Sequence, residues 1–215
     1  MSVITALEPQ QRRKGRTNVY IDGQYLIGVS DDVVARLRLR VGQPIDEVRL
    51  REVSAAEDLH RATDTALRFL ETRPRTRHEI EARLARDTYG EDVVTRVVEK
   101  LTGMGLLDDA QFAAQWVEAK TRPAAGRPAG RRRLTTDLYR KGVDKEIIEE
   151  AVAAIDDDDE LILARAALDK KIKTLPIEPE ALLAEKRRLS GFLARRGFGW
   201  GTISKALREV GVDEE

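Results

Sequence analysis

The arginine and lysine residues of this chain are its best candidates for binding an anionic partner, because many of them are clustered in segments that contain few acids. Segment 120–141 contains one acid, Asp137, and segment 185–196 contains one, Glu185. Clustered cations of this kind bind phosphate groups or acidic protein surfaces. The candidate binding residues of these segments are Arg127, Arg131, Arg132, Arg133, Arg140, Lys141, Lys186, Arg187, Arg188, Arg195 and Arg196. The alternative is a solvated helix face, but the basic excess recurs at corresponding positions of both segments.

Catalytic and metal-binding constellations are missing from the sequence. His60 and His78 are the only histidines, and they lack the spacing and the partner carboxylates of a zinc or acid–base site. The chain has no cysteine, which excludes disulfides and thiolate chemistry. The glycines at 197, 199 and 201 follow a predicted helix, whereas a dinucleotide-binding loop follows a strand. We therefore predict a binding protein with no catalytic residue, no metal and no cofactor.

Acidic residues are also gathered in one place. Segment 146–160 carries eight acids and no basic residue, and it ends in the aspartate run at 156–159 followed by Glu160. The run lacks the alternating spacing and the glycine turn of a calcium loop. We interpret it as a solvated acidic linker with helix N-cap character that separates two helical units.

The composition favours thin helical layers with a large solvated surface. Charged residues make up 35% of the chain and aromatic residues 5%, while the formal net charge is +0. No apolar run approaches the ~20 residues that cross a bilayer, and the first residues lack a signal-peptide pattern. We expect a cytoplasmic protein that does not associate with membranes and is a monomer.

The first 52 residues predict a small β-rich module. Strand-forming residues at 19–21 and 25–27 flank an Asp22-Gly23 turn, which is a hairpin signal. Residues 3–7 are a candidate third strand, and Ser30 is placed to cap a short helix. We interpret the basic connection at 12–16 as a solvated turn, with phosphate contact as the alternative.

Helical spacing replaces the strand pattern after this module. Capping boxes at Ser54 with Glu57 and at Thr76 with Glu79 predict two helix starts. A three-helix pattern then occurs three times, and its second and third helices align without gaps. The aligned leucines are 54 and then 55 residues apart, at Leu84, Leu138 and Leu193.

Each aligned leucine is followed four residues later by a predicted turn, at Thr88, Gly142 and Gly197. The two glycines are expected to end their helices in the left-handed conformation, which a side chain disfavours. Because threonine replaces glycine in the first repeat, we expect the first turn to differ.

These patterns predict a mainly α fold: a tandem array of three helix-turn-helix-like three-helix repeats, elongated and curved, preceded by the small β-hairpin-containing module. The predicted divisions are 1–52 for the β-rich module, 53–107 for repeat 1, 108–156 for repeat 2 and 157–215 for repeat 3.

Two motifs in and after the first repeat resemble those of the RecX family. Residues 73–80 read RPRTRHEI, and residues 105–109 read GLLDD, followed by Phe112 and Ala113. Together with the tandem repeats over residues ~55–211, they are close to the pattern of that family. The resemblance implies a regulator that lodges in the groove of the RecA filament on single-stranded DNA and restrains strand exchange and coprotease function, in DNA repair and the SOS response.

The partners implied are therefore RecA and single-stranded DNA, with double-stranded DNA as a further candidate. Secondary candidate contacts are Arg73, Arg75, Arg77 and Trp200. The main alternative is a helix-turn-helix regulator that reads duplex DNA without RecA. Acids on the predicted third helices, such as Glu99 and Glu149, argue against that alternative because phosphates would repel them.

Overall fold

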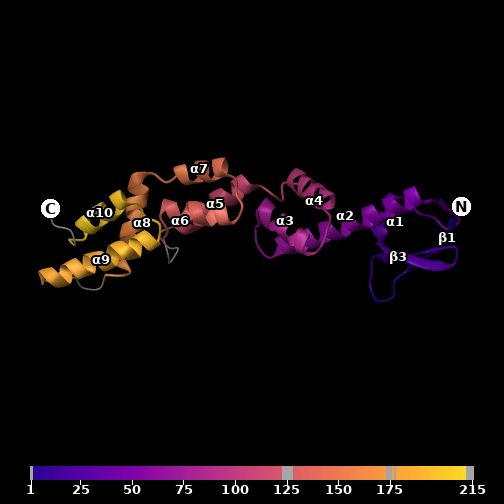
Figure 1. The fold of residues 1–215 in the computed structure, drawn as a ribbon, viewed down its shortest axis with the longest axis horizontal. Coiled ribbons are helices and arrows are strands. Elements are labelled where there is room, and N and C mark those ends of the chain that lie inside the picture. The colour runs from indigo at the N-terminus through magenta and orange to yellow at the C-terminus, as the bar shows by residue number, and fades with distance from the viewer. Residues whose placement is uncertain (1, 123–127, 173–175, 177, 212–215) are drawn as a thin grey trace. The chain divides into compact units, whose positions relative to one another are not determined.

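The computed structural model describes residues 2–122, 128–172, 176 and 178–211 (Figure 1). The chain forms two compact units. Unit 1 comprises Met1–Pro74 and Ile80–Leu106, and unit 2 comprises Arg75–Glu79 and Leu107–Glu215. The described residues contain four strands and ten helices. They confirm the mainly α fold of tandem three-helix repeats behind a β-rich module.

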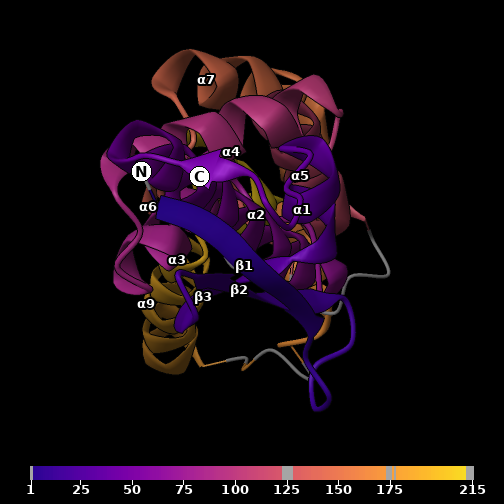
Figure 2. The ribbon, with the colours of Figure 1, turned by 90° about the vertical axis from the view of Figure 1, so that its right-hand side faces the viewer.

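The N-terminal sheet has the strand order β3-β2-β1-β4, and Figure 2 shows its three longer strands together. Its strands and the following short helix are β1 (Ser2–Pro9), β2 (Arg16–Ile21), β3 (Gln24–Ser30), α1 (Asp31–Arg36) and β4 (Pro44–Ile45). Asp22 and Gly23 both have positive φ, +49° and +83°, as a two-residue hairpin turn of type I′ requires. Ser30 accepts a hydrogen bond from the Val33 N–H and caps α1 as predicted.

The first repeat begins with a longer helix than the sequence predicts. Its helices are α2 (Glu47–Glu71), α3 (Arg77–Arg86) and α4 (Glu91–Gly103). Asp46 caps α2 by accepting from the Arg49 N–H at 2.7 Å, so Ser54 lies inside the helix and the predicted start there is wrong. Helix α2 therefore runs across the predicted boundary between residues 52 and 53.

The second predicted capping box is confirmed. The Glu79 N–H donates to Thr76 Oγ1 at 3.2 Å, and the Thr76 N–H donates to Glu79 Oε2 at 3.4 Å. These reciprocal bonds fix the start of α3.

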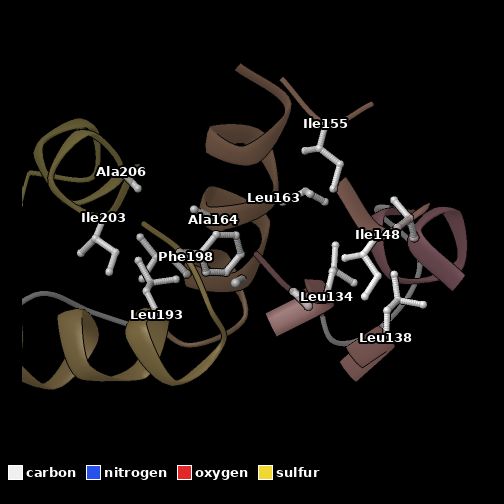
Figure 3. Close-up of a cluster of buried hydrophobic side chains, with 14 of the residues drawn as sticks. Leu134, Leu138, Ile148, Ile155, Leu163, Ala164, Leu193, Phe198, Ile203 and Ala206 are labelled. Atoms are coloured by element: carbon white, nitrogen blue, oxygen red, sulfur yellow. The ribbon is translucent and has the colours of Figure 1, made fainter. Parts of the chain in front are cut away.

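Unit 2 contains two further three-helix repeats. They are α5 (Asp109–Thr121), α6 (Arg131–Arg140) and α7 (Lys145–Ala153), then α8 (Asp157–Asp169), α9 (Pro179–Arg195) and α10 (Trp200–Glu209). Figure 3 shows Leu134, Leu138 and Ile148 gathered in one group and Leu193, Phe198 and Ile203 in another. These residues belong to one continuous buried cluster. The aligned Leu138 and Leu193 are therefore core residues, and Leu84 of the first repeat is also fully buried.

The turn of the first repeat does not differ from the other two, contrary to expectation. Thr88 has φ +63°, beside +73° for Gly142 and +82° for Gly197. The residue after each turn donates its N–H to the carbonyl of the aligned leucine, at 3.3 Å from Tyr89 and at 3.2 Å from both Val143 and Phe198. The repeat therefore imposes one backbone conformation, and threonine adopts it.

The room available for a Cβ atom at each turn explains which turns need glycine. A Cβ at Gly142 would overlap the His78 side chain, and a Cβ at Gly197 would overlap the backbone and side chain of Arg133. Thr88 is exposed, which leaves room for its side chain. Glycine is therefore required where a turn packs closely against the helix start of the preceding repeat.

Candidate functional site

Each repeat carries an acid on its first helix that accepts a backbone N–H from an element before that helix. Glu57 of α2 accepts from the Ser30 N–H at 2.7 Å. Asp109 of α5 accepts from the Arg77 N–H at 2.9 Å, and Glu160 of α8 accepts from the Arg131 N–H, also at 2.9 Å. Arg77 and Arg131 are the first residues of α3 and α6, where free N–H groups and the helix dipole favour an anion. The three acids therefore act as anchors for each successive first helix.

Arg131 belongs to the third of these anchors. Its Nη2 donates to Glu160 Oε2 at 3.0 Å and also to Asp157. The hydrogen bond to Asp157, followed by that to Glu160, raises the pKa of Arg131. Glu160 is only 2% exposed and also accepts from Thr202 Oγ1 at 2.9 Å. Arg131 therefore neutralises a buried carboxylate that would be costly to leave unpaired.

The acidic run belongs to a helix and is not a linker. Asp156 caps α8 by accepting from the Asp159 N–H at 2.7 Å, and residues 157–160 form the first turn. The expected N-cap character is confirmed, because acids at this end of a helix offset its dipole.

Lys141 also makes its contacts inside the fold. Its Nζ lies 3.2 Å from Glu79 Oε1, and it stands 4.5 Å from the ring centroid of Trp116 and 5.4 Å from that of Phe112. Its side chain is 17% exposed, and its backbone carbonyl accepts from Thr76 Oγ1 at 2.7 Å. Lys141 therefore links the start of α3 to the second repeat through an ion pair and two cation–π contacts.

Several other candidate cations have partners on or near their own helix. Arg133 pairs with Asp137, and Arg188 pairs with Glu185. Arg196 lies over the Phe192 ring at 4.7 Å and donates to the Pro128 carbonyl at 3.1 Å. Lys186 is half-buried. The charge of Arg133 and Arg188 is partly neutralised by these pairs, although both side chains are exposed.

Four candidates are exposed and form no ion pair with any described residue: Arg132, Arg140, Arg187 and Arg195. We call these four residues the exposed arginine set. The two on α6 are eight residues apart, as are the two on α9, so each pair lies on the same side of its helix. The spacing between the helices is 55 residues for both pairs, so the set occupies matching positions in two repeats.

The remaining candidates occupy different surroundings. Arg73 donates to the Pro74 carbonyl at 3.0 Å, Arg75 is half-buried and Arg77 is exposed. Trp200 is the first residue of α10 and is 65% exposed. Arg127 lies outside the described residues.

Sequence reasoning missed Tyr139, whose side chain is 73% exposed next to Arg140 on α6. An exposed aromatic beside cations offers a surface on which a base can stack. The repeat alignment gave no signal for it, because alanine occupies the matching positions 85 and 194.

The described residues contain neither a metal-binding cluster nor a helix that could span a membrane. None of their histidines and acids form a group of three or more that could hold a metal ion. No helix among them is long and apolar enough to span a membrane.

Four family models match successive parts of the chain. The model described as the regulatory protein RecX N-terminal domain matches residues 2–46. Those described as the first, second and third three-helix domains of RecX match residues 62–101, 108–152 and 157–207.

Comparisons with whole proteins and with solved structures give the same family. The regulatory protein RecX of Bacillus licheniformis is 30% identical over 100% of this chain and 80% of its own length. The protein of that name from Clostridium botulinum is 26% identical over 98% of this chain and 97% of its own length. A crystal structure of regulatory protein RecX is 25% identical, with a TM-score of 0.75 over 97% of this chain and 100% of the other. The crystal structure of RecX from Lactobacillus salivarius, at 21% identity, matches the fold with a TM-score of 0.63 over 74% of this chain and 99% of the other.

Proposed function

The chain belongs to the RecX family of regulatory proteins, and from this premise we propose that it binds the RecA filament on single-stranded DNA and restrains RecA recombinase and coprotease activity. The family supplies the partner, since RecA modulation is what the resemblance implies. The arrangement of the exposed arginine set supports the mode of binding.

A repeated surface suits a repeated partner. The exposed arginine set places the same cations at the same positions of two repeats, 55 residues apart. A filament presents recurring subunits and a DNA strand with recurring phosphates, so equivalent contacts add through avidity. Arginine is suited to both targets, because its guanidinium forms bidentate bonds with phosphates and carboxylates.

The alternative is a helix-turn-helix regulator that reads duplex DNA without RecA. Its third helices would enter the major groove. Exposed acids occupy two of the three third helices, at Glu91 and Glu99 of α4 and at Glu146 and Glu149 of α7. Phosphates would repel these acids, so the geometry favours binding through the second helices.

The test is RecA-driven strand exchange with and without this protein. We expect the full-length protein to slow exchange and to bind RecA filaments on single-stranded DNA more tightly than it binds the DNA alone. Replacing all four members of the exposed arginine set by alanine should weaken filament binding by about tenfold or more, because electrostatic steering and phosphate contacts are lost together. Unchanged strand exchange with the wild-type protein would exclude the proposal.

The matched control removes four other exposed cations of unit 2, so that the net charge of the two variants is the same. Its substitutions are Lys170→Ala, Lys171→Ala, Lys205→Ala and Arg208→Ala, at cations that likewise form no ion pair with a described residue. Both variants should keep the helical circular-dichroism signal of the wild type. Equal loss of filament binding in both would show a general charge effect and would contradict a role for the exposed arginine set.

A further inference from the structure

Unit 1 contains a cationic pocket that the proposed function does not use. It has a volume of about 560 Å³ and lies among the β1–β2 connection, the middle of α2 and the turn before α4. The connection contributes Arg13 and Lys14, Arg16 is the first residue of β2, and α2 contributes Arg61 and Arg68. We call this feature the N-terminal cationic pocket.

Most of the positive charge of the pocket has no ion-pair partner among the described residues. Arg13, Lys14, Arg61 and Arg68 are exposed, and none of them forms an ion pair with a described carboxylate. Asp64 is the one acid in the lining, and it faces His60, with its carboxylate 3.6 Å from His60 Nε2. Four cations therefore surround the opening with one carboxylate against them.

The fifth cation, Arg16, holds the wall of the pocket in place. Its Nη1 pairs with Glu57 Oε1 at 2.8 Å, and its Nη2 donates to the Gly28 carbonyl. Glu57 is only 2% exposed, so the pair fastens the start of β2 to α2. The backbone bonds from the Gln10 N–H to the Arg16 carbonyl at 2.8 Å and from the Asp31 N–H to the Gly15 carbonyl at 3.0 Å close the base of the connection.

Helix α2 forms one wall of the pocket and places two of its cations on one side of the helix. Arg61 and Arg68 are seven residues apart on α2, which places them two turns apart on the same side of the helix. Tyr89, the residue that follows the left-handed Thr88, lines the pocket beside them. A half-buried aromatic ring and four free cations thus line one opening.

From this arrangement we propose that the N-terminal cationic pocket binds phosphate groups of a polynucleotide strand. Guanidinium and ammonium groups are the side chains that recognise phosphates, and a volume of this size admits a nucleotide unit. Tyr89 supplies a surface on which a base stacks without regard to sequence. The site is separate from the exposed arginine set and requires no RecA, so it extends the proposed function and does not depend on it.

The test measures binding of a short fluorescein-labelled oligothymidylate to the full chain by fluorescence anisotropy, without RecA, over a series of KCl concentrations. We expect the double variant Arg61→Ala, Arg68→Ala to bind about tenfold more weakly. The slope of log affinity against log salt should fall by about 1.4, because each phosphate contact on a single strand contributes about 0.7.

The control is the double variant Arg40→Ala, Arg96→Ala, which removes two exposed cations of unit 1 that lie outside the pocket and form no ion pair with a described residue, and which leaves the same net charge. It should bind the oligothymidylate like the wild type, and both double variants should melt at the temperature of the wild type. Equal affinities of the two double variants would overturn the proposal.

A second experiment distinguishes a polynucleotide from free inorganic phosphate as the ligand of the pocket. Inorganic phosphate is added at constant ionic strength, with chloride as the reference. We expect it to leave oligothymidylate binding unchanged, since a strand offers several linked phosphates and a base. Displacement by inorganic phosphate from the wild type, but not from Arg61→Ala, Arg68→Ala, would make this a free-phosphate site and overturn the polynucleotide assignment.

Discussion

At the scale of single residues, Thr88 shows that the packing of the repeat can hold a residue in a backbone conformation that its side chain disfavours. The left-handed region costs an ordinary residue roughly 1–2 kcal/mol, and branching at Cβ makes it less favourable. Thr88 nevertheless adopts φ +63°. The surrounding hydrogen bonds and the buried Leu84 below the turn hold it there.

Relief of this strain gives the first prediction. Thr88→Gly should raise the free energy of unfolding by about 1 kcal/mol, because the gain in the left-handed region exceeds the added entropy of the unfolded chain. Denaturant titration followed by circular dichroism measures the change. Gly142→Thr is the matched reverse substitution and should destabilise, since its Cβ would overlap His78. A destabilised Thr88→Gly protein would refute the strain argument.

At the scale of elements, the helices and the hairpin could be predicted, and their anchoring could not. The Asp22-Gly23 turn and the Thr76–Glu79 capping box are local signals that need only neighbouring residues. Glu57 carried a local signal too, as a partner for Ser54, but its carboxylate bonds Ser30, 27 residues away. Glu160 bonds Arg131 across 29 residues. Neither pairing follows from spacing along the chain, because tertiary packing decides it.

The anchor at Glu160 gives the second prediction. Glu160→Gln should lower the free energy of unfolding by about 2 kcal/mol or more, since the buried partner of Arg131 loses its charge. Asp158→Asn is the control, because Asp158 is an exposed acid in the same helical turn. It should change stability by less than about 0.5 kcal/mol. Denaturant midpoints compare the two, and equal effects would contradict an anchoring role for Glu160.

The anchor at Asp109 gives a prediction about pH. Burial raises the pKa of Asp109 above the ordinary 3.8, although the hydrogen bond from the Arg77 backbone opposes the shift. A carboxyl whose pKa is raised in the folded state contributes stability below the unfolded pKa and loses it as pH rises through the folded pKa. The Asp109→Asn variant keeps an acceptor for the Arg77 N–H and does not titrate.

We therefore expect the stability of the wild type relative to Asp109→Asn to be greatest below pH 3.8 and to fall towards neutral pH. Denaturant unfolding of both proteins across that range measures the difference. Parallel stability curves would show that Asp109 has no raised pKa.

At the scale of the whole molecule, the basic segments of the sequence divide into cations that pair inside the fold and cations that stay exposed without an ion pair among the described residues. The formal net charge is +0, and part of the basic segment 120–141 pairs with the acidic segment 146–160, as Arg131 does with Asp157 and Glu160. Lys141 pairs with Glu79. The exposed arginine set is the smaller group of these cations that is exposed and has no ion pair among the described residues, and it occupies repeated positions. The sequence identified the basic segments but could not show which of their cations are paired inside the fold and which are exposed. Burial and pairing depend on contacts between elements that lie far apart along the chain.

Substitutions at two adjacent residues of α6 test the distinction between cations that stabilise the fold and cations that are free to bind a partner. Arg131 is 35% exposed and bonds the buried Glu160, whereas Arg132 is exposed and has no ion pair among the described residues. Arg131→Ala should lower the melting temperature by several degrees, because it leaves a buried carboxylate without its cation. Arg132→Ala should leave the melting temperature unchanged and weaken binding to RecA filaments on single-stranded DNA. Thermal unfolding and filament-binding titrations of both variants give the answer: if both lose stability equally, Arg132 is structural and the exposed arginine set is not a separate surface.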